Sequence, residues 1–145
     1  MKRRRLATLL TLVCLAPTSM STPADSELSR ALTAIHLRAG SPPDLRERDR
    51  APAWLLQHEA RAFDEVLGRV LAAPDDAVLV DLLGRYRRAE ARPALLCAFD
   101  SARAQPYAAV GLAQSPDPAA RAALVRLAAE HAEPAARSLA AEQLK

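Results

Sequence analysis

Apolar residues recur at helical spacing along most of this chain. The clearest stripe has apolar side chains at i, i+3, i+4, i+7 and i+8, at positions Phe63, Val66, Leu67, Val70 and Leu71. This spacing places all five on one face of an α-helix, and such a face has to be buried against another element. Pro52 is well placed to begin this helix, because a missing proline N–H is tolerated in the first turn.

The region before this stripe divides into a predicted helix and a predicted loop. Leu28, Leu32 and Ile35 share one face, which predicts a first helix over 25–39. Residues 40–52 then lose the pattern: two adjacent prolines remove backbone donors, and alternating arginines and acids offer no apolar face. We therefore expect an irregular, proline-rich loop there.

The rest of the chain reads as short helices separated by breaks. A third helix with Leu79, Leu82 and Leu83 facing inward follows the break at 73–76. Later helices begin near prolines, namely Pro93, Pro106, Pro118 and Pro134. The chain is 50% hydrophobic but only 3% aromatic, a composition that favours helices over strands. The fold class predicted is all-α, with about seven helices joined by short connections.

Residues 92–144 look like one helix-turn-helix unit written almost twice. Arg92, Ala94, Leu95 and Leu96 match Arg121, Ala123, Leu124 and Val125 at a shift of 29, and Pro106 matches Pro134 at a shift of 28. A period of this size is typical of solenoids, in which each helix pair covers the apolar face of its neighbour.

These two units resemble the HEAT-like repeats found in many bacterial proteins. RSLAAEQL at 137–144 resembles the closing helix of that family, and DPAARAALVRLAAEH at 117–131 resembles its partner helix. The copy at 106–114, PYAAVGLAQ, departs from the pattern because it lacks the expected arginine. The resemblance implies a short α-solenoid of HEAT-like helix pairs over 25–145. It also implies a binding scaffold whose partner is another protein.

The N-terminal residues 1–24 have the outline of a secretory signal peptide. Lys2 and three arginines precede an apolar run of about eleven residues, well short of the roughly 20 that span a bilayer. Small residues allow cleavage after Ala24 or after Ser21. The chain is therefore predicted to be exported, to the periplasm or outside the cell, with the membrane involved only through this signal. A lipid anchor at Cys14 is the less favoured alternative, because Val13 is branched.

Charge argues against a nucleic-acid partner. The chain carries 20 basic and 17 acidic residues, but four of the basic ones and none of the acidic ones lie in 1–24. Residues 25–145 thus carry 16 basic against 17 acidic residues, without the cationic surplus that phosphate binding needs. One local cluster could bind an anion or an acidic partner, or could simply be a solvated helix end: Arg85, Arg87, Arg88 and Arg92.

No catalytic constellation is visible, and we expect neither enzymatic activity nor a cofactor or metal. His36, His58 and His131 are scattered, and the His58-Glu59 pair lacks the second histidine of a zinc-protease helix because position 62 is alanine. The alternative is a small enzyme or ligand-binding domain with a pocket between the first helices, lined by Trp54, His58 and Tyr86.

Two further expectations concern Cys97 and self-association. Cys97 is the one thiol that would remain after signal cleavage, and its neighbours Leu96 and Phe99 favour burial within the helix packing. The ends of a short solenoid expose surface, so a homodimer that covers one end is an alternative to a separate partner.

Overall fold

The computed structural model describes residues 23–145, and every regular element among them is helical. The elements are α1 (Pro23–Ala34), α2 (Pro42–Gln57), α3 (Glu59–Ala72), α4 (Ala77–Arg85), the 3-10 turn η1 (Ala89–Ala91), α5 (Arg92–Phe99), α6 (Gln105–Gln114), α7 (Pro118–Glu130) and α8 (Pro134–Glu142). The all-α prediction is confirmed. The predicted signal peptide, 1–24, lies outside the described residues except for its last two positions, which begin α1.

The loop predicted over 40–52 is wrong, because α2 begins at Pro42. Pro42 and Pro43 occupy the first turn, where backbone N–H groups have no partner within the helix, so the prolines cost little. The Asp44 carboxylate accepts hydrogen bonds from the Ser41 backbone N–H at 2.9 Å and from the Ser41 hydroxyl at 2.5 Å. These bonds lower the pKa of Asp44 and fix the start of the helix.

The helix expected to begin at Pro52 is instead divided between two elements. Pro52 lies inside α2, which ends at Gln57, and α3 starts two residues later at Glu59. His58 joins them with a backbone outside the helical region, at φ −105° and ψ 35°. The first helix is also shorter than the predicted 25–39, because α1 ends at Ala34. The described chain consequently has eight α-helices, against the seven or so expected.

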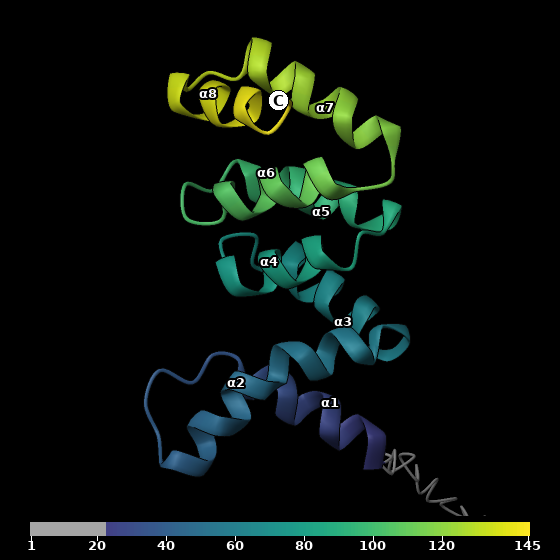
Figure 1. Cartoon of the computed structure of the whole chain (residues 1–145), viewed down its shortest axis with the longest axis vertical. Coiled ribbons are helices and arrows are strands. Elements are labelled where there is room, and N and C mark those ends of the chain that lie inside the picture. Colours follow the sequence, from purple (N-terminus) through teal and green to yellow (C-terminus); the bar gives the residue numbers. More distant parts are fainter. Residues whose placement is uncertain (1–22) are drawn as a thin grey trace, which may run out of the picture.

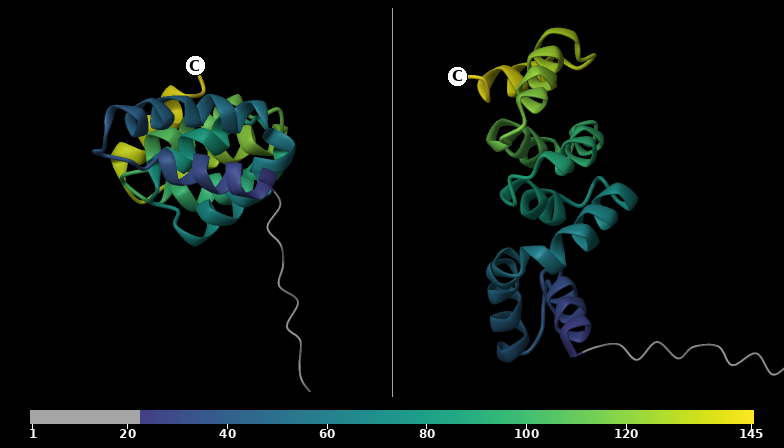
Figure 2. Two further views of the ribbon diagram at one scale, coloured as in Figure 1. Left: turned by 90° about the horizontal axis from the view of Figure 1, so that it is seen from below. Right: turned by 90° about the vertical axis from the view of Figure 1, so that its right-hand side faces the viewer.

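The helices from α3 onward stack along the long axis of the molecule. Helices α4, α6 and α8 lie one above another, and α4 and α8 both pack against α6 (Figure 1). Helix α3 packs against α5, while α5 with α6 and α7 with α8 form successive hairpins. Figure 2 shows the same stack from two further directions, with α1 and α2 at the end remote from the C-terminus.

The core runs continuously through this stack. Its largest fully buried side chains come from seven of the eight helices: Leu32, Leu55, Phe63, Val66, Val70, Val80, Leu83, Leu95, Phe99, Leu112 and Leu124. Helices α6 and α8 contribute mainly alanines, including Ala108, Ala109, Ala136 and Ala140, each fully buried. Small side chains let helix axes approach closely, which is how such short elements cover one another.

Candidate interaction surface

A surface groove lies between α4 and α6. Its volume is approximately 340 Å³, and its lining residues are Asp81, Gly84, Arg85, Tyr107, Val110, Gly111 and Gln114. Residues 81 and 85 are one turn apart on α4, and 107, 110 and 114 follow one face of α6, so each helix forms one wall.

Two glycines form the floor of this groove. A Cβ atom placed on Gly84 would lie 2.8 Å from the Gly111 Cα atom, closer than non-bonded carbons can approach. Both glycines are buried within their helices. The two backbones are in contact here, so the larger side chains of α4 and α6 that flank the glycines form the walls of the groove.

The walls of the groove expose apolar side chains. On the α6 wall, Tyr107 is 44% exposed and Val110 is 38% exposed. Val78 is not part of the groove lining but lies on the same face of α4 as Asp81, and it is 44% exposed. A single exposed apolar residue is ordinary, but three on two packed helices form a patch. Asp81 and Arg85 border it with an exposed ion pair at 3.8 Å. We call these five residues the α4/α6 surface. This surface has an apolar centre and a charged border.

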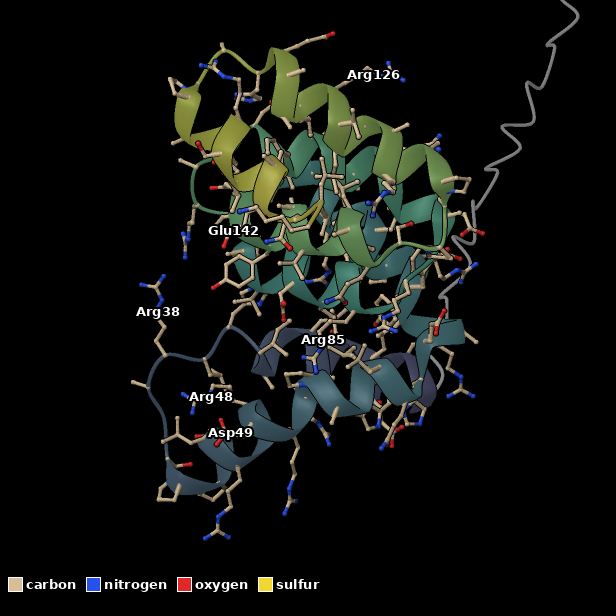
Figure 3. The ribbon with its side chains drawn as sticks, turned by 45° about the horizontal axis from the view of Figure 1, so that its top comes forward. Arg38, Arg48, Asp49, Arg85, Arg126 and Glu142 are labelled. Atoms are coloured by element: carbon tan, nitrogen blue, oxygen red, sulfur yellow. The ribbon has the colours of Figure 1, made fainter. Side chains whose placement is uncertain are left out.

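The four arginines of the predicted anion patch do not converge. Arg85 belongs to the α4/α6 surface (Figure 3), whereas Arg88 lies over the Phe63 ring at 4.1 Å and pairs with Glu59 and Glu90 at 3.8 and 3.2 Å. The hydrogen bond to Glu90 raises the pKa of Arg88. Arg92 pairs with Asp117, the N-cap of α7. Arg87 is exposed and forms no ion pair with any described residue.

The three residues proposed to line a ligand pocket separate in the structure. The Tyr86 side chain is buried, and its hydroxyl donates to the Leu55 carbonyl at 3.1 Å. Burial raises the pKa of Tyr86 to about 12. The Trp54 ring stacks on the His58 ring at 4.1 Å. Trp54 lines the groove between α1 and α2, and His58 and Tyr86 are not among the residues that line that groove.

The three histidines form hydrogen bonds at separate places in the structure. His36 Nε2 lies 2.7 Å from the Asp76 carboxylate, which also caps α4, so α1 is tied to α4. His58 Nδ1 lies 2.8 Å from the Trp54 carbonyl oxygen. His131 Nδ1 accepts from the Glu133 N–H at 3.1 Å, between α7 and α8. Among residues 23–145, no group of three or more His, Cys, Asp and Glu side chains is arranged to hold a metal ion.

Cys97 is exposed, so the prediction of burial is wrong. Helix α5 buries Ala94, Leu95, Ala98 and Phe99, which form one face at spacings i, i+1, i+4 and i+5. Cys97 lies on the opposite face from Leu95 and Phe99, two residues from each, and Leu96 is itself only partly buried.

Comparison with known proteins gives no further assignment. No protein-family model, curated protein or solved structure matches this chain. Within the described part of the chain, none of the helices has both the length and the apolar character needed to cross a bilayer.

Proposed function

We propose that this chain is an exported, non-catalytic protein–protein interaction module, built as a short α-solenoid of HEAT-like helix pairs. The observation that carries the proposal is the α4/α6 surface, an exposed apolar patch on the helical stack. Exported location rests on the sequence of 1–24 and is tested separately, by finding the processed N-terminus of the tagged full chain in the periplasmic or extracellular fraction.

The placement of matching residues supports the repeat. Leu95 on α5 and Leu124 on α7 correspond at a shift of 29 and are 1% and 0% exposed. Ala108 on α6 and Ala136 on α8 correspond at a shift of 28 and are both 0% exposed. Packing of α4 and α8 against opposite sides of α6 is the nearest-neighbour stacking that a solenoid requires.

The arginine of the HEAT-like closing helix has an identifiable role. Arg137 on α8 donates to the carbonyl oxygens of His131 and Ala132 at 2.6 and 3.2 Å, so it holds the connection that follows α7. The preceding unit lacks that arginine. There, Gln105 at the start of α6 donates to the Phe99 carbonyl oxygen at the end of α5, at 2.9 Å. In both units a side chain of the second helix thus bonds the backbone at or just after the end of the first helix.

Site-specific photo-crosslinking tests the proposal on the full chain in its native envelope. A benzophenone amino acid in place of Tyr107 should form a discrete adduct with a protein partner. The matched control is the same substitution at Val125 on α7, which is 52% exposed but lies away from the α4/α6 surface. Adducts of the same yield and mass at both positions, or at neither, would contradict the proposal.

A loss-of-binding variant makes the second half of the test. Tyr107→Ser with Val110→Ser removes apolar area from the surface without removing a buried side chain, and should weaken retention of the crosslinked partner by tenfold or more, since about 1.4 kcal/mol corresponds to tenfold. Val125→Ser should leave retention unchanged. Circular dichroism of both variants checks that the helices are intact.

The alternative function, a small enzyme or ligand-binding domain with a pocket between the first helices, keeps one supporting observation. Trp54 lines the groove between α1 and α2, but His58 and Tyr86 do not. We favour the interaction module because the five residues of the α4/α6 surface lie together, whereas the residues expected to line the ligand pocket do not: Tyr86 is buried in the core.

A further inference from the structure

A second and larger groove lies between α1 and α2. These two helices form the end of the molecule remote from the C-terminus (Figure 1). Its volume is approximately 510 Å³, within the range of ligand-binding clefts. It shares no residue with the α4/α6 surface. An inference about this groove therefore stands whether or not the α4/α6 surface binds a partner.

One wall of this groove is cationic. Arg46, Arg50 and Trp54 follow one another at spacings of four residues, so they lie along one face of α2. Arg46 and Arg50 are exposed, and neither forms an ion pair or a side-chain hydrogen bond with any residue in 23–145. The remaining arginine of α2, Arg48, is half-buried and pairs with Asp49 at 2.7 Å.

The lining as a whole has one more cationic than anionic side chain. Arg30 on α1 reaches Glu47 on α2 at 3.6 Å, with side chains 69% and 45% exposed, a separation and exposure at which an ion pair is worth little. Glu27 is the other carboxylate in the lining. Three guanidinium groups therefore face two carboxylates, and the two arginines on α2 have none opposed to them in a contact.

Between the walls the floor is apolar. Ala31 and Ala51 are 7% and 3% exposed, and Pro43 and the partly buried Trp54 ring complete the lining. The back of the Trp54 ring is covered by His58. A ligand with charged groups alone would leave this apolar floor exposed to water. A ligand that also carries apolar side chains between its carboxylates would cover the floor.

We propose that the groove between α1 and α2 binds an acidic segment of a partner polypeptide, with carboxylates on Arg46 and Arg50 and an apolar side chain against Trp54. The exposed guanidinium groups and the open side of the groove suit an extended chain better than an enclosed small molecule. Arginine matches carboxylate geometry with two parallel hydrogen bonds. Glu27, which also lines the groove, would repel an acid placed next to it.

Intrinsic fluorescence tests this directly, because Trp54 is the chain's one tryptophan. The probe is a synthetic peptide in which leucines are spaced among glutamates. Titration of the full chain should give a saturable change in Trp54 emission that weakens as salt rises, because exposed charge pairs are screened. A peptide with lysine at every glutamate position should give no saturable change.

The matched variants are Arg46→Glu with Arg50→Glu, and Arg126→Glu as the control. Arg126 is exposed on α7 at the far end of the molecule (Figure 3) and forms no ion pair with a described residue. The double variant should weaken peptide binding by about tenfold or more, and Arg126→Glu should not change it. Equal weakening by both, equal response to the lysine peptide, or the same response to inorganic phosphate would overturn the proposal. Unchanged far-ultraviolet circular dichroism excludes unfolding as the cause.

Discussion

Gly84 on α4 and Gly111 on α6 face each other at a crossing too close for any other residue. A Cβ atom on Gly84 would lie 2.8 Å from the Gly111 Cα atom, and one on Gly111 would lie 2.9 Å from the Gly84 Cα atom. The obstruction is backbone, not the end of a flexible side chain, so it cannot rotate away. This contact determines both the spacing of the two helices and the floor of the α4/α6 surface.

Gly84→Ala should therefore destabilise the protein. Helix propensity alone would favour alanine by about 1 kcal/mol, but the overpacked crossing should cost more, leaving a net loss of about 1–3 kcal/mol in the free energy of unfolding. Urea unfolding followed by circular dichroism measures the difference.

The control for that substitution is Gly68→Ala on α3, where a new Cβ atom would meet no other atom within 4 Å. This change should raise the free energy of unfolding by up to about 1 kcal/mol. If Gly84→Ala stabilised the protein as much as Gly68→Ala, the close crossing would not exist in solution.

Arg87 is the one described non-glycine residue with a positive φ, at 54°, and it directly follows the cap of α4. A left-handed conformation costs an L-residue about 1–2 kcal/mol and costs glycine almost nothing, although glycine loses more entropy on folding. Arg87→Gly should consequently stabilise the protein by about 0.5–1 kcal/mol, measured by thermal or urea unfolding.

Arg85→Gly, two residues away, should change the free energy of unfolding in the opposite direction. It removes the same charge, but Arg85 is helical and pairs with Asp81, so glycine should cost about 1 kcal/mol. If both substitutions destabilised the protein alike, the left-handed conformation at Arg87 would be disproved.

The buried Tyr86 hydroxyl makes stability depend on alkaline pH. Burial first, and the nearby Glu59 carboxylate second, raise the pKa of Tyr86 from 10.0 to about 12. Between these values the unfolded chain releases the phenolic proton and the folded chain keeps it, so stability is intact below pH 10 and falls as pH rises toward 12. The loss attributable to Tyr86 should reach about 2–3 kcal/mol at most.

Tyr86→Phe separates this effect from general alkaline damage. At pH 8 the variant should be less stable by about 1 kcal/mol, because the hydrogen bond to the Leu55 carbonyl is lost. Between pH 10 and 12 its stability should fall less steeply than that of the natural chain. Parallel slopes for the two proteins would assign the pH dependence to other groups.

Periodicity predicted the helices that have an apolar face, and missed what capping and position decide. Phe63, Val66 and Val70 are buried as predicted, whereas Leu71, at the edge of that stripe and next to the end of α3, is 52% exposed. Helix α2 buries only Ala51 and Leu55, so its existence depends on the Ser41–Asp44 cap more than on a stripe. No hydropathy pattern reports a cap of that kind.

The α4/α6 surface could not be predicted from the sequence, for a different reason. Tyr107 and Val110 belong to an apolar run in which buried and exposed residues look alike. Tertiary packing, including the close crossing at Gly84 and Gly111, determines which face α6 turns outward. The arginine cluster is predicted from adjacency along the chain, but folding places three of its members in separate ion pairs and leaves Arg87 without one among the described residues.

The exposure of Cys97 makes a chemical prediction. Its thiol should react with iodoacetamide in the native protein at a rate within about tenfold of that in the urea-unfolded chain, because no opening is needed to reach it. Peptide mapping by mass spectrometry distinguishes Cys97 from Cys14. A thiol buried in the core would instead react at least about a thousandfold more slowly, since it would wait for unfolding.

The control is a cysteine placed at Ala98, which is 0% exposed, in a Cys97→Ser background. It should be protected under native conditions and react fully in urea. Equal protection at both positions would mean that α5 is turned differently from the structure.

If the chain is exported as proposed, an accessible Cys97 should also form an intermolecular disulfide under oxidising conditions, because no second thiol lies in residues 25–145. Non-reducing electrophoresis should then show a dimer that Cys97→Ser abolishes.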